Sequence, residues 1–265
     1  MLTRLPSFAW LALALLPVSA ALAAPAGQIS ETTGYVTVTN AQQTPVSAKK
    51  GTGVESGQVI TTGANGQAVI RFQDGQVIAL KSNSIFKVNK YTYDQAYPEK
   101  GESFFSLLQG GLRAVTGLIG AQNRAGWRLA TPTATMGIRG TDFFVVIDQA
   151  TYLKVTTGAV SATNTAGQLV VVANEAGVIT SASVAGVSVP VSSLPAGLFA
   201  EIEAMSLTGA LSGAAAGAGA AGTTMIGGVP AWVVGIGIAA GAGAAAAGGG
   251  GGDGGTPTTT QHSAP

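Results

Sequence analysis

Short runs of alternating hydrophobic and polar residues fill the chain from residue 34 to about residue 180. Residues 35–39 alternate and are rich in β-branched side chains, and two further runs flank the turn pair Asp74-Gly75. More runs of this type lie at residues 58–62, 142–147, 151–156, 159–163 and 168–172. Such spacing is typical of a β-sandwich, barrel or short solenoid and not of a βαβ fold. We expect an all-β domain, a β-sandwich or short β-solenoid, over residues 30–195. Its one helix-like segment is residues 103–109.

The β pattern ends near Pro195. Residues 198–207 are predicted to form a helix with Glu201 and Glu203 on its solvent side. Beyond them alanine and glycine dominate, so residues 196–247 are expected to be a helical or spacer segment. Residues 248–265 hold almost no apolar side chains that would offset chain entropy, so we expect a disordered tail.

The Ala/Gly segment leaves two hypotheses open. Residues 229–248 are long enough to span a bilayer as a helix, and residues 204–226 form a second candidate. The pairs Gly213/Gly217 and Gly237/Gly241 have the spacing that lets two membrane helices approach closely. Against insertion, the segment is mostly alanine and glycine, and no Lys or Arg follows it. The chain is therefore either membrane-associated through residues 204–248 or carries a spacer there.

The N-terminus has the pattern of a signal peptide. Arg4 precedes an apolar run at residues 8–16, Pro17 ends that run, and Ala21 and Ala23 give the small-x-small pattern of a cleavage site. The apolar run is shorter than the roughly 18 residues that a membrane span needs. We expect residues 1–23 to be removed and the protein to be exported to the periplasm or cell envelope.

Charge and reactive residues exclude several classes of function. All 13 Lys and Arg lie at or before Lys154, without the clustering that nucleic-acid binding requires. The chain has no Cys, and its one His, His262, lies in the expected tail. A G-x-G-x-x-G pattern at residues 217–222 follows no strand and arises from the Ala/Gly composition. We expect no catalytic site, no cofactor, no metal site and no nucleic-acid partner.

Three stretches together resemble a known family. They are residues 57–63 leading to 70–77, then 108–117, then 130–141. In this order they resemble the FecR domain family, named for a periplasmic regulator of iron transport, over residues 34–191. The named regulators carry a cytoplasmic anti-sigma segment, a membrane helix, the FecR domain and a receptor-binding βαβ domain. This chain has a signal peptide where the cytoplasmic segment would be, so it resembles the stand-alone exported members.

Within these motifs the glycines are predicted to serve the backbone. Asp74-Gly75 fits a tight turn with positive φ at the glycine. Gly110, Gly111 and Gly140 permit a bulge or a close approach of two chain segments. These residues are therefore candidates for structural roles.

Two arginines interrupt apolar runs. Arg113 and Arg139 are each expected to pair with a carboxylate, with Asp74 and Asp142 as the first candidates. Arg139, followed by Gly140, Thr141 and Asp142, leads directly into an apolar strand, so its loss is predicted to cost about 3–5 kcal/mol. The alternative is that both arginines bind an anion or a peptide carboxylate.

These features predict an exported, non-enzymatic binding or scaffolding module of the bacterial cell envelope. Its partner is expected to be an envelope protein or a small ligand. The alternative is an envelope sensor that passes a signal to a regulatory partner in the inner membrane.

Overall fold

The structure, a computed structural model, describes residues 25–39, 44–207, 209–211, 225–226 and 229–230. It consists mainly of β-strands, which confirms the fold class expected from the sequence. The expected signal peptide, the tail 248–265 and most of the Ala/Gly segment lie outside the described residues. Among the helices that the structure describes, none is long and apolar enough to cross a membrane.

The main sheet has 15 strands and folds into two layers that share its three longest strands. The strands of the first layer are, in order, β4 (Gly53–Val54), β1 (Gly27–Thr33), β6 (Gln67–Phe72), β7 (Val77–Leu80), the second half of β9 (Glu102–Val115), the second half of β11 (Thr135–Ile147), the first half of β12 (Thr151–Asn164), β14 (Glu175–Ile179) and β15 (Val187–Pro190).

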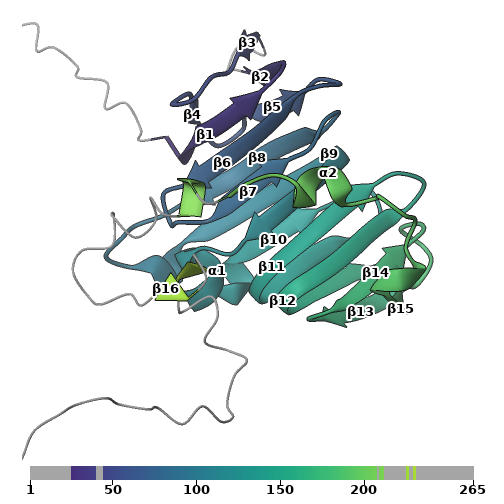
Figure 1. The fold of residues 1–265 in the computed structure, drawn as a ribbon. Coiled ribbons are helices and arrows are strands. Elements are labelled where there is room, and N and C mark those ends of the chain that lie inside the picture. The colour runs from purple at the N-terminus through teal and green to yellow at the C-terminus, as the bar shows by residue number, and fades with distance from the viewer. Residues whose placement is uncertain (1–24, 40–43, 208, 212–224, 227–228, 231–265) are drawn as a thin grey trace, which may run out of the picture.

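The second layer uses the other halves of the long strands. Its order is β3 (Pro45–Ser47), β2 (Val36–Thr39), β5 (Val59–Thr62), β8 (Ile85–Thr92), the first half of β9, β10 (Trp127–Ala130), the first half of β11, the second half of β12, and β13 (Gly167–Val172). All these pairs are antiparallel except β9 with β10. Figure 1 shows the strands side by side from β1 at one end to β15 at the other.

Glycines lie where the long strands pass from one layer to the other. Gly110 in β9, Gly140 in β11 and Gly158 in β12 have φ values of 80°, 60° and 78°. Asn174, between β13 and β14, has a φ of 67°. A Cβ atom on Gly158 would lie 2.0 Å from the carbonyl oxygen of Gly140. The bends of neighbouring strands therefore nest against one another, and the positive φ and the short distance both require glycine.

The hydrophobic core lies between the two layers. Aromatic rings run through it: the ring centroid of Phe105 lies 5.1 Å from that of Phe72, 5.4 Å from that of Phe86 and 6.2 Å from that of Trp127. Trp127 in turn meets Phe143 edge-on at 5.8 Å. Both layers are thus joined by one continuous core.

Residues 103–109, expected to be helix-like, are part of strand β9, so that prediction is wrong. Ser103, Phe105 and Leu107 are buried, whereas Leu108 is exposed. The pairing of β8 with β9 contains two register shifts, which interrupt the strict alternation of a strand. The short helices lie elsewhere: η1 (Pro98–Lys100), α1 (Leu118–Gln122), η2 (Arg124–Gly126), η3 (Val191–Ser193) and α2 (Ala200–Glu203).

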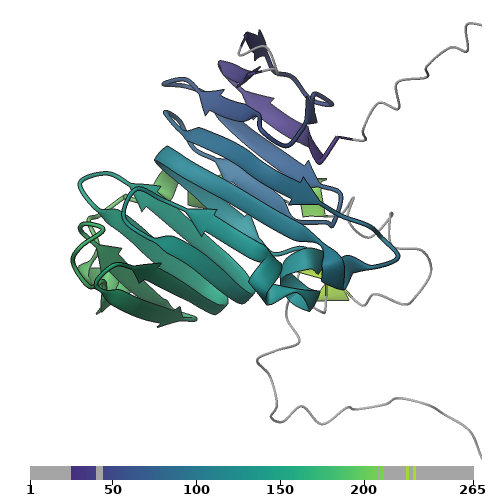
Figure 2. The ribbon, with the colours of Figure 1, turned by 180° about the vertical axis from the view of Figure 1, so that it is seen from behind.

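A C-terminal segment crosses the outer face of the first layer. We call residues 194–207 and 209–211 the strap; it contains α2 and lies in front of β7, β9 and β11 in Figure 1. Figure 2 shows the opposite side, with the strap behind the sheet. The expected boundary of the folded unit at Pro195 is therefore too early. A two-stranded hairpin, β16 (Met225–Ile226) with β17 (Val229–Pro230), follows the strap.

Candidate functional site

The turn between β6 and β7 holds a buried carboxylate. Gly75 has a φ of 83°, and Asp74 beside it is 1% exposed. The Asp74 carboxylate accepts hydrogen bonds from the Tyr91 hydroxyl at 3.0 Å and from the backbone N–H groups of Gln76 and Ile119 at 3.2 Å each. Burial raises the pKa of the Asp74 carboxyl. Asp74 therefore fixes the turn and the start of α1, and it pairs with neither arginine.

Arg113 and Asp142 form an ion pair on the outer face of the first layer. The guanidinium donates to both carboxylate oxygens, at 2.9 and 2.7 Å, and the two side chains are 23% and 10% exposed. The bond to Asp142 raises the pKa of Arg113. The guanidinium also lies 5.1 Å from the centre of the Phe144 ring. Of the two expected arginine pairs, this one is present.

Arg139 is exposed, so the expectation that it pairs with a carboxylate is wrong. No ion pair of its side chain is formed within the described residues. Arg139 follows the buried Ile138 in the regularly paired part of β11, so the alternation of the strand places its side chain on the exposed face. Arg139 lines a surface hollow of about 400 Å³ together with Arg124 and Ser161.

Other motif residues hold neighbouring strands together. The Thr116 hydroxyl accepts a hydrogen bond from the Thr141 N–H at 3.0 Å and donates to the Thr141 carbonyl at 2.9 Å. The Ser84 hydroxyl likewise bridges both backbone groups of Gly111 at 3.0 Å. A Cβ on Gly111 would come within 2.8 Å of Val146, so a close strand approach explains this glycine.

Sequence reasoning missed one buried polar pair. The indole N–H of Trp127 donates to the Gln76 side-chain oxygen, and both residues are buried. The Gln76 Nε2 atom has no hydrogen-bond partner within the described residues. The pair could not be predicted from local sequence signals, because Gln76 and Trp127 are distant along the chain.

The strap covers an apolar sheet face. Outward-facing residues of the first layer are buried beneath or beside it: Val69, Val77, Ala79, Val115, Phe144 and Val146. The strap contributes the buried side chains of Phe199, Ile202, Leu207, Ala210 and Leu211. Phe199 meets Phe144 edge-on, with ring centroids 5.9 Å apart. Apolar contact therefore holds the strap along its described length.

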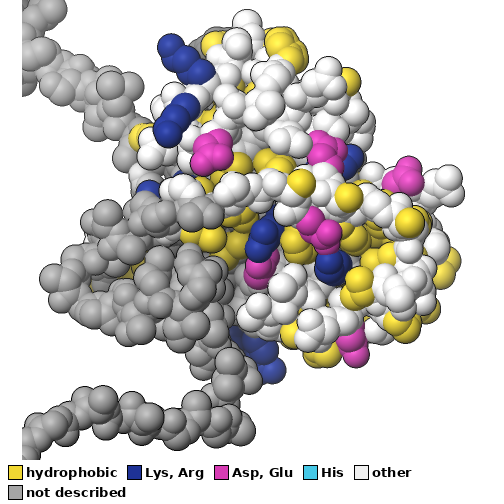
Figure 3. Space-filling model, in the orientation of Figure 1, with side chains coloured by type: hydrophobic (Ala, Val, Ile, Leu, Met, Phe, Trp, Pro, Cys, Tyr) yellow, Lys and Arg dark blue, Asp and Glu magenta, His cyan; other side chains and the backbone are white. Residues whose placement is uncertain are grey.

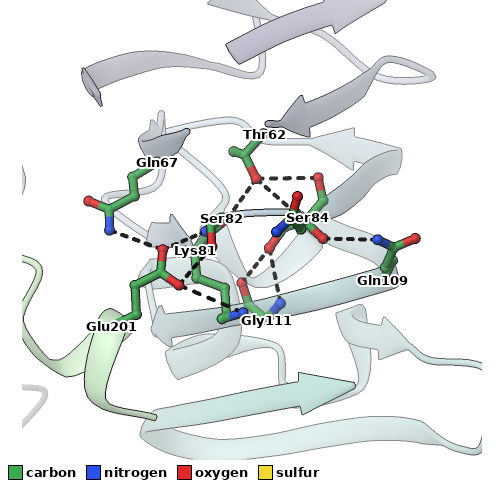
Figure 4. Close-up of polar contacts among 9 residues, drawn as sticks. Thr62, Gln67, Lys81, Ser82, Ser84, Gln109, Gly111 and Glu201 are labelled. Carbon is green, nitrogen blue, oxygen red and sulfur yellow. Dashed lines mark hydrogen bonds and ion pairs between the residues drawn. The ribbon is translucent and has the colours of Figure 1, made fainter. Parts of the chain in front are cut away.

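Glu201 anchors the strap to the sheet (Figure 4). Its carboxylate accepts hydrogen bonds from the Ser82 N–H at 2.7 Å, the Ser82 hydroxyl at 2.8 Å and the Gln67 amide at 3.1 Å. Lys81 Nζ lies 3.7 Å from the same carboxylate. Burial opposes the ionisation of Glu201, but these hydrogen bonds and the Lys81 charge outweigh it and lower the pKa of Glu201. The expectation that Glu201 faces solvent is therefore wrong.

A second ion pair fixes the other side of α2. Glu203 pairs with Lys154, whose ammonium also lies 5.3 Å from the Phe144 ring centre and 5.9 Å from that of Phe199. Figure 3 shows basic and acidic side chains next to one another in the middle of this face, with hydrophobic side chains around them. The two strap carboxylates thus meet two lysines of the sheet.

A family model described as FecR protein matches residues 58–161, which run from β5 into β12. The chain carries a FecR domain. The match lies within the resemblance expected over residues 34–191 and includes the ion pair Arg113–Asp142 and the turn at Asp74.

Solved structures give a weaker likeness. Two crystal structures of a proposed anti-sigma factor from Parabacteroides distasonis ATCC 8503, at 1.65 and 2.50 Å resolution, are each 15% identical and match 50% of this chain with a TM-score of 0.41. The match spans 59% of the length of those chains. No curated protein matches the chain.

The strapped face has apolar and charged side chains that together hold a chain segment. It combines apolar side chains with Lys81 and Lys154, each of which pairs with a carboxylate of the strap. The strap lies outside the residues that the family model matches. The face therefore lies within the residues that match the family, and the segment bound to it lies outside them.

Proposed function

We propose that the protein is an exported, non-enzymatic FecR-domain protein that binds or scaffolds other components in the bacterial cell envelope. The observation that carries the proposal is the strapped face. It holds a chain segment through apolar burial and through the ion pairs Lys81–Glu201 and Lys154–Glu203. A sheet surface that receives one peptide segment in this way is suited to receive another with the same pattern of apolar and acidic residues.

The motif residues support a binding role over a catalytic one. A general acid or base has to reach its substrate, and Asp74 is enclosed by protein on all sides at 1% exposure. The Arg113 guanidinium is already engaged by both oxygens of Asp142. In this proposal the motif residues stabilise the sheet, and the strapped face of the sheet binds the partner.

Location in the envelope rests on the sequence of the first 23 residues. Arg4, the apolar run 8–16 and the small residues Ala21 and Ala23 support export and cleavage. The partner is then an envelope component, and we propose that its bound segment is apolar with carboxylates spaced like those of α2.

The test is lysine crosslinking in cells of the source bacterium, followed by fractionation and peptide mass spectrometry. Lys81 and Lys154 report on the strapped face, and the exposed Lys90 in β8, a strand of the second layer, is an internal control. The full chain is compared with Ile202→Asp, which places a charge in the apolar contact of the strap.

The proposal predicts an envelope-bound protein in which Lys81 and Lys154 gain crosslinks to envelope proteins in Ile202→Asp, while crosslinks of Lys90 do not change. A regulatory inner-membrane protein as the crosslinked partner would support the sensor alternative. Recovery in the cytoplasmic fraction, or face lysines that never crosslink to another molecule, would refute the proposal.

A further inference from the structure

The two layers of the sheet end in four strands, and one of these differs from the others. Edge strands expose unpaired backbone groups, and proteins protect them with short length, proline, charge or bulges. β4 has two residues, and β1 beyond it carries Glu31 and a register shift. β3 has three residues and contains Pro45, and β15 has four and ends in Pro190. β13 has six residues, GQLVVV, with no proline and no charge. Three edges are therefore protected and the fourth is not.

The unprotected edge is regular and apolar. β13 pairs with β12 over Gly167–Val172 without a register shift, and it pairs with no other described strand. Alternate residues of such a strand direct their N–H and C=O groups away from the partner, which leaves a row of free donors and acceptors. Val170 and Val172 are 51% and 45% exposed beside this row.

The neighbouring loop does not protect the edge. Residues 181–184 are hydrogen-bonded to the tip of the β12–β13 hairpin, at Asn164 and Thr165. Within the described residues, no hydrogen bond joins that loop to the backbone of β13. The strand is therefore open along its length to a further strand.

We propose that β13 pairs antiparallel with β13 of a second copy of this chain, so that the second layers of two molecules form one continuous sheet. Pairing across a twofold axis places each residue near its own counterpart or that counterpart's neighbours. Like charges opposite each other destabilise such pairs, and β13 has none. With the twofold axis at Val170, Val170 instead meets its own counterpart and Val171 meets Leu169, which are favourable cross-strand neighbours. This inference goes beyond the binding role above and does not depend on it.

The surface area that the contact buries determines the expected affinity of the dimer. A single pair of six-residue strands buries far less than the roughly 1,200 Å² of a standard stable interface. We therefore expect a reversible dimer with a dissociation constant on the order of micromolar to tens of micromolar. Sedimentation velocity of the full mature chain from about 1 to 200 µM covers this range.

Matched substitutions test the contact site. Val170→Lys places a charge at the twofold contact, and Val46→Lys makes the same change at an equally exposed valine on the protected edge β3, both being 51% exposed. We expect Val170→Lys to raise the dimer dissociation constant roughly tenfold or more, and Val46→Lys to leave it unchanged. Circular dichroism verifies that both variants are folded.

A second measurement identifies the strands directly. The chain contains no Cys, so single cysteines at position 170 or 46 report only on their own contacts. Val170→Cys should form an intermolecular disulfide under mild oxidation, and Val46→Cys should not. A chain that stays monomeric to 200 µM, a dimer insensitive to Val170→Lys, or equal crosslinking at both positions would overturn the proposal.

Discussion

Replacing Arg113 by alanine tests the structural role of the FecR motifs. The substitution removes two charge-assisted hydrogen bonds and leaves the Asp142 carboxylate, 10% exposed, without its partner. Breaking one half of a buried pair typically costs about 3–5 kcal/mol. Because the Arg113 side chain is 23% exposed, water can partly replace it, and about 2–3 kcal/mol is the better value.

The Phe144 ring adds to this loss. A guanidinium 5.1 Å from a ring centre contributes about 0.5–1 kcal/mol at a partly exposed site. The total for Arg113→Ala is therefore about 3 kcal/mol, a large share of the 5–15 kcal/mol of a typical domain. Arg113→Lys should recover only part of it, since lysine cannot bind both carboxylate oxygens with a planar fork.

Arg139→Ala is the matched control. Arg139 is an exposed arginine on the strand that also carries Asp142, so its loss should change stability by no more than about 0.5 kcal/mol. In urea, with a slope of about 2 kcal/mol per molar, the midpoint of Arg113→Ala should fall by about 1.5 M and that of Arg139→Ala should stay. Equal midpoints for the two variants would refute the role assigned to the Arg113–Asp142 pair.

Three further predictions concern the bends and the strap. Gly158→Ala should destabilise the protein by about 3 kcal/mol or more, because the new Cβ would collide with backbone atoms. Gly51→Ala, also at positive φ but with open space around the Cβ, should cost only about 1 kcal/mol, and thermal unfolding of the two variants tests the difference. Hydrogen bonds lower the pKa of Glu201, so the stability that its carboxylate contributes is complete above about pH 5 and is lost as pH falls through its folded-state pKa. The difference in unfolding free energy between wild type and Glu201→Gln, about 1–2 kcal/mol at pH 7, should therefore vanish on acidification. A difference that stays constant with pH would contradict the assignment. Limited proteolysis should leave a fragment ending near Leu211, and one ending near Pro195 would contradict the packing of the strap.

The sequence predicts the class of fold well, because turn pairs and alternating runs are local signals. Asp74-Gly75 occupies the predicted turn, and Gly140 lies at a bend between layers. Local signals do not show toward which neighbours a side chain points. Arg113 and Arg139 look alike in sequence, but Arg113 on β9 lies beside Asp142, whereas Arg139 lies on the exposed face of β11.

The strap was also missed, although the sequence carries a trace of it. Residues 77–80 and 143–147 are unbroken apolar runs, and strands buried on both faces read in this way. These runs indicate that another segment of the chain covers the outer side of Phe144 and Val77. The covering segment lies beyond Pro195, where the Ala/Gly bias hides the few side chains, such as Ile202, that make the contact.

The central claim, that the FecR sheet face binds the strap, is tested most directly by amide hydrogen exchange on the full chain. The account predicts that residues 199–207 exchange at least roughly tenfold more slowly than an unstructured peptide. In Ile202→Asp this protection should be lost while β11 stays protected. Exchange of residues 199–207 at the unstructured rate in the wild type, with β11 protected, would contradict the claim.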